Sequence, residues 1–319
     1  MDVAEDGANE LHIVAGYATS AMAFHHLQEL QQRGLFVRIR LIIGMVADQG
    51  ISISNHRGFR ELAQAQFPDV FICSYLTREP AVHSKSYVWI RDGQPIRAFV
   101  GSANYTQASF LGLRREALSE DDPVEVEDYY NRLLDESVYC NHNDAENLVA
   151  VVNDRAFNRQ RRLIDHYADG DTILERRPEL MGLESVTISL LNRSGELPGR
   201  SGLNWGQRPE LHREPNQAYI RVPANIARSD FFPPRAQHFT VLTDDGFVLI
   251  CSIAQQNRKA IHTPHNNSHI GEYFRRRLSV PMGHPVHLDN LVRYGRTDMS
   301  FYKIDDETYY LDFSVTNNG

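Results

Sequence analysis

The sequence is poor in the residues that build disulfide frameworks, zinc sites and membrane spans. Its three cysteines, Cys73, Cys140 and Cys251, lie far apart and form no CxxC pair, so neither a disulfide framework nor a zinc knuckle is predicted. The longest apolar run, Leu41–Ala47, is far too short to cross a bilayer, and the acidic N-terminus argues against a secretory signal. We therefore expect a soluble, cytoplasmic protein with no membrane partner.

Lysine is also scarce. Only Lys85, Lys259 and Lys303 are lysine among the 33 basic residues, and all the others are arginine. A GC-rich genome explains such a bias. Because lysine is so rare in this chain, a lysine at a motif position is harder to dismiss as chance. The net charge of −8 comes from the first 180 residues, whereas the rest of the chain holds almost equal numbers of acidic and basic residues. The C-terminal half is therefore free to be locally basic.

Length and composition indicate two globular domains. A chain of 319 residues with 42% hydrophobic and 23% charged residues is close to the globular average, which excludes disorder and fibrous repeats. We place the boundary between residues 175 and 176. The N-terminal domain would include a connecting helix over Ala145–Leu163.

The N-terminal half alternates between strand and helix patterns, which predicts an α/β domain with a mixed, largely parallel sheet flanked by helices. A hairpin follows, in which the strand Ser84–Arg91 turns at Asp92–Gly93 and returns as Ile96–Val100. The expected strands and helices that surround it are Leu11–Tyr17, Ser20–Arg33, Phe36–Ile43, Phe59–Phe67, Val70–Ser74 and Val124–Leu134.

The C-terminal half predicts a small all-β barrel. Two long polar loops interrupt its short strands: the first loop, Asn192–Asn216, and the second loop, Gln255–His269. Loops of this length inside a compact domain are usually functional. The strands are expected at Val186–Leu191, Ala218–Val222, His238–Leu242, Phe247–Ile253 and Tyr309–Phe313.

One constellation carries chemistry. His83 and Lys85 open the hairpin strand as an HxK motif, and Ser102 and Asn104 close the return strand as GSxN. An alternating strand places His83 and Lys85 on one face, about 7 Å apart, and the return strand brings Ser102 and Asn104 beside them. This set suits attack on a phosphodiester. The imidazole is the nucleophile, while ammonium, amide and hydroxyl groups stabilise the charged transition state. The sequence offers no carboxylate cluster for a metal, so we expect no metal site and no cofactor in the chemical step.

At these residues the chain resembles the phospholipase D superfamily, whose signature is HxK followed by GSxN. The family's usual Asp, five residues after the Lys, would fall at Ile90. Nucleases of the superfamily often use a carboxylate after GSxN instead, and Glu116 stands where it is expected. The resemblance implies that Glu116 accepts a hydrogen bond from the second nitrogen of His83 and fixes its tautomer.

The superfamily active site uses two copies of the signature, because one His attacks while the other must be protonated to release the leaving oxygen. This chain has one copy. The resemblance therefore implies a C2 homodimer through the N-terminal domain, with a shared site to which each protomer contributes His83.

Further blocks in the C-terminal half resemble those of NgoFVII-type restriction endonucleases, in which a phospholipase D-like nuclease domain precedes a DNA-recognition domain of the plant B3 kind. The resemblance implies a B3-like pseudobarrel and metal-independent cleavage of double-stranded DNA at a short, GC-rich site in a bacterial restriction-modification system. Further partners would be a cognate DNA methyltransferase and, as in some members, a separate helicase-like ATPase subunit that uses ATP. The blocks are Ser201–Arg208, Asn216–Ile220, Phe231–Pro233, Thr243–Gly246, Gly271–Arg275 and Tyr294–Asp298.

The two polar loops are the expected DNA-binding arms. Arginine pairs bidentately with guanine and Asn or Gln with adenine, while the other cations contact phosphates. Trp205 is expected in the core, and Arg275–Arg277 at the DNA backbone or at a helix end. The candidate DNA contacts are Arg193, Arg200, Asn204, Gln207, Arg208 and Arg213 in the first loop, and Gln255, Gln256, Asn257, Arg258, Lys259, His262, Asn266 and Asn267 in the second.

Two other functional classes remain open. The HxK signature also fits a phospholipase or another phosphotransferase of the superfamily, which the single motif copy and the polar loops disfavour. The third class is a DNA-binding module with an inactive nuclease half. Its support is Ile90 at the Asp position, and the intact His83, Lys85, Ser102 and Asn104 speak against it. We predict a site-specific endodeoxyribonuclease.

Overall fold

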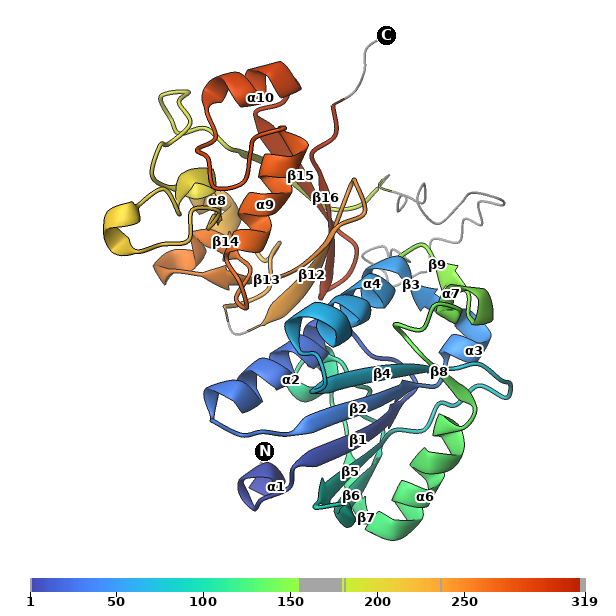
Figure 1. The fold of residues 1–319 in the computed structure, drawn as a ribbon. Coiled ribbons are helices and arrows are strands. Elements are labelled where there is room, and N and C mark those ends of the chain that lie inside the picture. The colour runs from blue at the N-terminus through green and yellow to red at the C-terminus, as the bar shows by residue number, and fades with distance from the viewer. Residues whose placement is uncertain (1, 155–179, 181, 236, 316–319) are drawn as a thin grey trace. The chain divides into compact units, whose positions relative to one another are not determined.

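The computed structural model describes residues 2–154, 180, 182–235 and 237–315 (Figure 1). The chain divides into two compact units, an N-terminal unit Met1–Asp154 and a C-terminal unit Arg155–Gly319, and each is described by itself. The predicted boundary at residues 175 and 176 lies outside the described residues.

The N-terminal unit follows most of the predicted order of strands and helices. Thr19 caps the helix α2, because its side chain accepts a hydrogen bond from the Met22 amide, and the helix buries Phe24, Leu27 and Leu30 at helical spacing. The strands are β1 (Glu10–Ala15), β2 (Arg38–Ile43), β3 (Ile51–Ser52), β4 (Phe71–Leu76), β5 (Ser86–Arg91), β6 (Gln94–Gly101), β7 (Leu118–Asp121), β8 (Ser137–Tyr139) and β9 (Val151–Val152). The helices are α1 (Asp2–Glu5), α2 (Ser20–Gln32), α3 (Val46–Gln49), α4 (Ile53–Glu61) continued by the π-helical turn η1 (Leu62–Gln66), α5 (Gln107–Phe110), α6 (Pro123–Leu134) and α7 (Ala145–Leu148).

Seven of these strands form one mixed sheet in the order β7-β6-β5-β1-β2-β4-β8. Only β1, β2 and β4 pair in parallel, and the other neighbours are antiparallel. The expectation of a largely parallel sheet is therefore wrong. The two-residue turn at Asp92–Gly93 can join only antiparallel strands, and the hairpin and β8 also pair antiparallel with β1 and β4. Figure 1 shows α2 and α4 on one face of this sheet and α6 on the other.

The predicted connecting helix Ala145–Leu163 is wrong over its described part. The helix α7 ends at Leu148, and Val151 pairs in parallel with Ile51 as strand β9. Because Val149, Val151 and Val152 are β-branched, this stretch favours extended backbone over helix. The remaining residues of the predicted helix, from 155 on, lie outside the described residues.

The C-terminal unit is a seven-stranded, nearly closed barrel-like sheet in the order β10-β15-β16-β12-β13-β14-β11. All neighbours pair antiparallel except β12 and β16. Its core packs Phe232, Phe239 and Tyr309 together. The strands are β10 (Ser185–Ser189), β11 (Ile220–Arg221), β12 (His238–Thr243), β13 (Val248–Ala254), β14 (Ala260–His262), β15 (Asp298–Lys303) and β16 (Thr308–Asp312). The helices are η2 (Gly202–Asn204), η3 (Pro209–Leu211), α8 (Ala224–Ala227), η4 (Gln256–Arg258), α9 (Ser268–Arg277) and α10 (Leu288–Tyr294).

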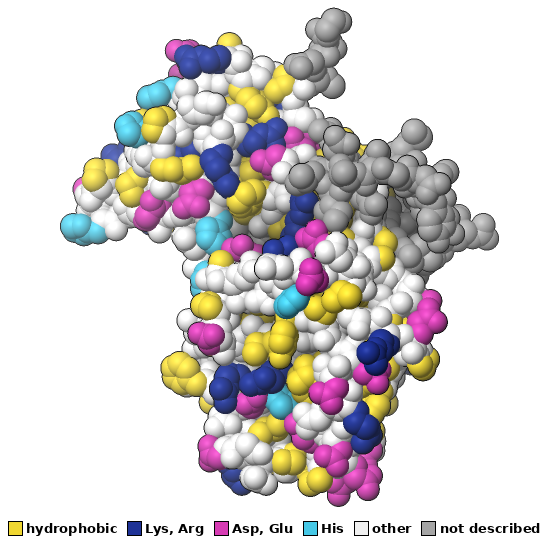
Figure 2. Space-filling model, turned by 45° about the vertical axis from the view of Figure 1, so that its right-hand side comes forward, with side chains coloured by type: hydrophobic (Ala, Val, Ile, Leu, Met, Phe, Trp, Pro, Cys, Tyr) yellow, Lys and Arg dark blue, Asp and Glu magenta, His cyan; other side chains and the backbone are white. Residues whose placement is uncertain are grey.

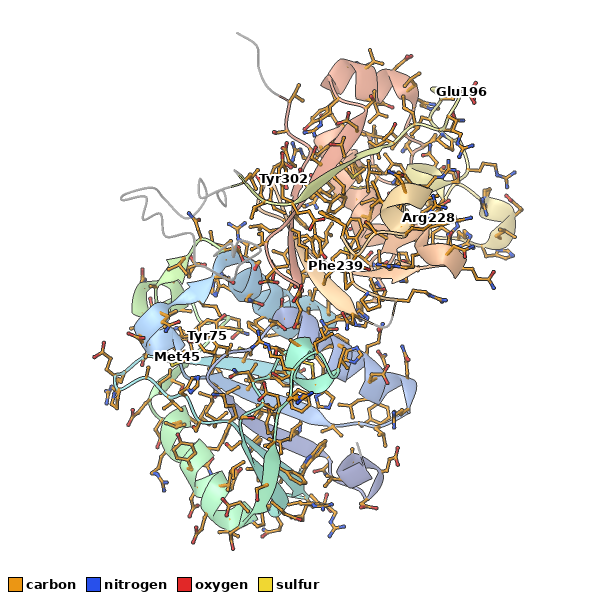
Figure 3. All side chains as sticks on the ribbon, turned by 180° about the vertical axis from the view of Figure 1, so that it is seen from behind. Met45, Tyr75, Glu196, Arg228, Phe239 and Tyr302 are labelled. Carbon is orange, nitrogen blue, oxygen red and sulfur yellow. The ribbon has the colours of Figure 1, made fainter. Side chains whose placement is uncertain are left out.

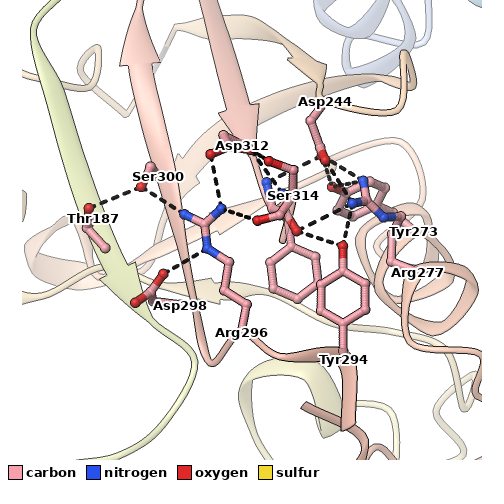
Figure 4. A network of polar contacts seen from close by, with 11 residues as sticks. Thr187, Asp244, Tyr273, Arg277, Tyr294, Arg296, Asp298, Ser300, Asp312 and Ser314 are labelled. Atoms are coloured by element: carbon pink, nitrogen blue, oxygen red, sulfur yellow. Dashed lines mark hydrogen bonds and ion pairs between the residues drawn. The ribbon is translucent and has the colours of Figure 1, made fainter. Parts of the chain in front are cut away.

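A buried ionic network joins the β12–β13 turn to α9 and to the end of β16 (Figure 4). The Arg277 guanidinium donates to both carboxylate oxygens of Asp244 at 2.7 Å, and Tyr273 donates to the same carboxylate. Tyr294 donates to the Phe313 carbonyl oxygen at 2.7 Å. Burial alone would lower the pKa of Arg277, but the Asp244 carboxylate outweighs it and raises that pKa. The network therefore holds a paired charge inside the barrel.

Candidate active site and nucleic-acid interface

His83 and Lys85 lie in the segment that leads into β5, just before the strand begins at Ser86. Ser86 pairs with Val100, and the Gly101 amide donates to the Lys85 carbonyl oxygen at 3.0 Å. The antiparallel register therefore places the HxK segment beside the start of GSxN, as the hairpin pattern predicts.

Lys85 contacts the imidazole directly. Its Nζ lies 3.1 Å from each ring nitrogen of His83 and donates to the His83 carbonyl oxygen at 2.5 Å. The Lys85 side chain is buried, whereas His83 is exposed. Burial lowers the pKa of the Lys85 ammonium, and the nearby Glu116 carboxylate opposes this shift. A buried cation thus lies against an exposed imidazole that a substrate can reach.

Ser102, Asn104 and Glu116 complete the group. The Ser102 hydroxyl donates to a Glu116 carboxylate oxygen at 2.5 Å and accepts from the Ala117 amide at 3.1 Å. The Asn104 Oδ1 accepts from the Tyr17 amide at 3.1 Å, so the Asn104 side chain is fixed to the end of β1. The five predicted catalytic residues therefore lie on neighbouring segments as two bonded pairs, His83 with Lys85 and Ser102 with Glu116, together with Asn104, which bonds the Tyr17 amide.

Glu116 has partners other than the expected one. Its carboxylate accepts from Ser102 and from Ser109, the latter at 3.5 Å, and among the described residues it has no hydrogen bond to His83. The tautomer-fixing contact with His83 is therefore not made here. In this arrangement Glu116 instead orients the Ser102 hydroxyl.

Two glycines and a tyrosine near the site were not predicted as site residues. A β-carbon on Gly16 would lie 3.0 Å from Cδ2 of His83, and one on Gly44 would lie 2.2 Å from the Val82 carbonyl oxygen. The Tyr17 ring lies edge-on to the imidazole, with centroids 6.0 Å apart. Each glycine directly follows a buried strand, β1 or β2, and that position is the one signal the sequence offered.

The predicted DNA-binding residues separate into two sets. Several amide and imidazole groups hydrogen-bond inside the C-terminal unit. Asn204 is 1% exposed, donates to the carbonyl oxygens of Pro198 and Val286, and accepts from the Val286 amide. The candidate DNA contact Asn204 therefore has a structural role here, because every polar group of its side chain is already bonded inside the unit.

Other candidates also have internal partners. Gln207 donates to the Pro215 and Gly283 carbonyl oxygens, and Arg258 donates to the Phe232 carbonyl oxygen at 2.5 Å. His262 lies between Ser252 and Asn267 at hydrogen-bond distance, and burial lowers its pKa. These hydrogen bonds stabilise the conformation of the two loops.

Arginines of the first loop are held by neighbouring groups. Arg213 stacks over the Trp205 ring at 3.9 Å, and Arg200 pairs with Glu210. Arg208 donates to the Arg200 carbonyl oxygen at 2.9 Å. Trp205 itself is half-buried, edge-on to Tyr219, instead of lying in the core.

The second set is exposed at the surface, where DNA could reach it. These residues remain predictions as DNA contacts. They are Arg193 in the first loop and Gln255, Gln256, Asn257, Lys259 and Asn266 in the second.

Two of the three arginines in Arg275–Arg277, Arg275 and Arg277, point into the C-terminal unit. Arg275 is fully buried and donates to the carbonyl oxygens of Pro215, Gly271 and His284. Arg277 belongs to the Asp244 network, and Arg276 stacks over Phe247. The run therefore stabilises the barrel and the end of the first loop.

Two features are absent from the described part of the chain. It holds no group of three or more His, Cys, Asp or Glu side chains that could bind a metal ion. No helix in it has the length and apolar character needed to cross a membrane.

Comparison with solved structures finds distant likenesses. A polyphosphate kinase from Porphyromonas gingivalis is 16% identical, with 45% of this chain and 22% of that chain covered and a TM-score of 0.29. NucT from Helicobacter pylori is 17% identical, with 43% of this chain and 86% of that chain covered and a TM-score of 0.30. No curated protein sequence matches the chain.

Two family models match in succession and together cover most of the sequence. Residues 1–147 match the NgoFVII restriction endonuclease N-terminal PLD domain, and residues 179–305 match the NgoFVII C-terminal B3-like DNA-binding domain. The first match contains the linked His83 and Lys85 group, and the second contains both polar loops. This chain therefore belongs to the NgoFVII restriction endonuclease family, and it is a DNA nuclease with a phospholipase D-like nuclease domain and a B3-like DNA-binding domain.

Proposed function

We propose that this nuclease is a type II-like restriction endonuclease that cleaves duplex DNA at a short, GC-rich site by covalent catalysis through His83, with no metal ion in the chemical step. The observation that carries the proposal is the contact between the His83 imidazole and the buried Lys85 ammonium, 3.1 Å from each ring nitrogen. With this contact, one phosphate group could bind the Lys85 ammonium and be attacked by the His83 imidazole.

The chemistry divides into two displacements at phosphorus. An imidazole nitrogen of His83 attacks, an N–P bond forms and the bond to the leaving DNA oxygen breaks. Lys85, Asn104 and the Ser102 hydroxyl stabilise the charge on the non-bridging oxygens. Water then attacks the phosphohistidine, the N–P bond breaks, and the imidazole is regenerated.

The leaving oxygen needs a proton that the attacking histidine cannot supply, because the attacking ring must be neutral. We infer that this proton comes from His83 of the partner subunit, in a C2 homodimer with one shared site. That histidine, once deprotonated, can then take a proton from the attacking water. A helicase-like ATPase subunit and a cognate DNA methyltransferase are the proposed partners in the cell.

The test is cleavage of long, sequence-diverse duplex DNA in EDTA, with and without ATP. We expect discrete fragments from the wild type, no fragments from His83→Ala, and wild-type cutting from His142→Ala. His142 is the matched control because its exposed side chain lies outside the site. Acid quenching should trap end-labelled DNA on the wild-type protein and not on His83→Ala.

Three results would overturn parts of the proposal. Activity that EDTA abolishes would contradict the metal-independent mechanism, and release of lipid headgroups from vesicles without DNA cleavage would favour a phospholipase. Mixing excess His83→Ala with wild type tests the dimer. A shared site predicts loss of activity in mixed dimers, whereas independent sites predict simple dilution.

A further inference from the structure

The C-terminal unit carries a strip of exposed cations that lies outside both predicted loops for most of its length. We define this basic edge as Arg221 on β11, Arg228 directly after α8, and Lys259, which lies in the second loop directly before β14. All three side chains are exposed. Figure 3 shows Arg228 beside the α8 segment of this unit.

The three positions are fixed to one another by backbone pairing and packing. Arg221 pairs with Ala260 in the β11–β14 ladder, and the Val222 amide donates to the Lys259 carbonyl oxygen at 2.8 Å. The short helix α8 packs against η4, which is part of the second loop. The edge is therefore part of the barrel surface and has a defined place next to Gln255, Gln256 and Asn257.

The charges of the basic edge are not neutralised within the protein. Among the described residues no ion pair involves Arg221, Arg228 or Lys259, although Asp230 lies two positions after Arg228. Some other surface cations of this unit are paired, such as Arg200 with Glu210 and Lys303 with Asp306, whereas Arg293 is exposed and has no ion pair among the described residues. Unpaired cations on a rigid edge attract a polyanion without the cost of breaking internal ion pairs.

We propose that the basic edge binds the phosphate backbone of the DNA duplex and sets the register of the second loop in the groove. The inference deepens the proposed function and rests on DNA recognition by this unit. Phosphate contacts position a protein on DNA, whereas contacts with base edges specify sequence. Arg221 and Arg228 are thus assigned to positioning, next to the exposed amides that are candidates for base readout.

The experiment measures duplex binding in EDTA in a His83→Ala parent, so that cleavage plays no part. Arg221→Ala and Arg228→Ala are compared with Arg293→Ala, which removes the same charge from an exposed position on α10. Figure 1 shows α10 well apart from α8 and β14 within this unit. Each edge variant should weaken binding about 3- to 10-fold near physiological salt and reduce the slope of log affinity against log salt by about 1.

The loss should be the same for cognate and scrambled duplexes, because phosphates carry no sequence information. The double variant should reduce the slope by about 2, and Arg→Lys at both positions should restore it. Restoration by lysine separates a charge contact from a folding defect, which the thermal midpoint of each variant also reports.

Two results would overturn the inference. Edge variants that bind like Arg293→Ala, in a parent that binds DNA, would show that the basic edge makes no contact while leaving DNA recognition intact. A loss confined to the cognate duplex would assign these arginines to base readout. A parent that binds no duplex at all would contradict DNA recognition and the basic edge together.

Discussion

The catalytic group and the DNA-binding loops differ in how closely the residue pattern determines the position of a side chain. All five predicted catalytic residues lie on the segments that the hairpin brings together, although Glu116 bonds Ser102 instead of His83. In the loops, by contrast, Asn204 is buried, and Gln207, Arg258 and His262 bond inside the unit. The spacing of motifs across a hairpin predicts which side chains lie close together. The polar composition of a loop does not predict where its side chains point.

The physical reason lies in hydrogen-bond register. The tight turn pairs Arg91 with Gln94, and a β-bulge between Trp89 and Ile90 then shifts the register by one residue. The shifted antiparallel pairing aligns Ser86 with Val100, and the Gly101 amide donates to the Lys85 carbonyl oxygen. A polar loop has no such constraint. Its amides satisfy buried carbonyl groups or face solvent according to contacts made with distant segments, such as Asn204 with Val286.

The largest expected effect compares one lysine from each region. Lys85→Met should reduce single-turnover cleavage about 10³-fold, because it removes the charge beside the attacking imidazole while the apolar chain keeps its burial. Lys259→Met should leave the cleavage rate at saturating DNA unchanged and weaken DNA binding by less than about 10-fold. Quenched-flow cleavage and equilibrium binding measure the two quantities separately.

The thermal midpoint of both variants serves as the folding control. If Lys85→Met weakened binding and left the chemical rate intact, the lysine would belong to substrate binding. The contrast between a catalytic and a binding region would then fail at this residue.

An intermediate effect compares two amides within the C-terminal unit. Asn204→Ala should lower the free energy of unfolding by about 2 kcal/mol, because it leaves buried carbonyl and amide groups of Pro198 and Val286 without partners. Gln256→Ala should change it by less than about 0.5 kcal/mol, since its side chain is exposed. Urea unfolding gives both values.

Gln256→Ala should lower affinity for the cognate duplex more than for a scrambled one. Asn204→Ala, measured where it is folded, should bind both as the parent does. An Asn204 variant with unchanged stability and lost specificity would return Asn204 to the set of base readers.

The smallest expected effect is a pH dependence of stability in the N-terminal unit. Burial lowers the pKa of His26 to about 3, and its Nδ1 lies 3.0 Å from the Tyr105 hydroxyl oxygen. In the unfolded chain a histidine titrates near its ordinary value of about 6.5. Between these values the unfolded state binds the extra proton, so stability falls as pH drops from about 6.5 towards 3.

Urea unfolding at pH 7.5 and 5.5 measures this effect. Wild type should lose about 1 kcal/mol more than His26→Gln over this interval, while His142→Gln, at an exposed position, should behave like wild type. An equal loss in all three proteins would show that His26 titrates normally in the folded state.

Much of the fold follows from local patterns. The strands β1, β2, β4, β5 and β6 and the helices α2 and α6 match the predicted segments within a few residues, because apolar periodicity and caps such as Asp122 mark them. The strands β3, β7, β8, β9, β14 and β15 were not predicted, and the helices α9 and α10 contradict the expectation of an all-β C-terminal half. Most of these strands are short, whereas β15 has six residues and buries Met299 and Phe301 in alternation. The strand β7 is fully exposed at the edge of its sheet, in a part of the unit rich in acidic side chains (Figure 2).

Residue identity and spacing along the chain are enough to predict the family of both domains and the hairpin, apart from the bulge beside Ile90 that shifts its register. The packing of the folded chain turned some loop amides inward, brought Glu116 to Ser102, and made Gly16 and Gly44 leave room for the segment carrying His83. It also placed Arg221 and Arg228 beside the second loop. Those outcomes depend on contacts between segments far apart in sequence, and a buried polar group bonds whichever partner the packing brings within reach.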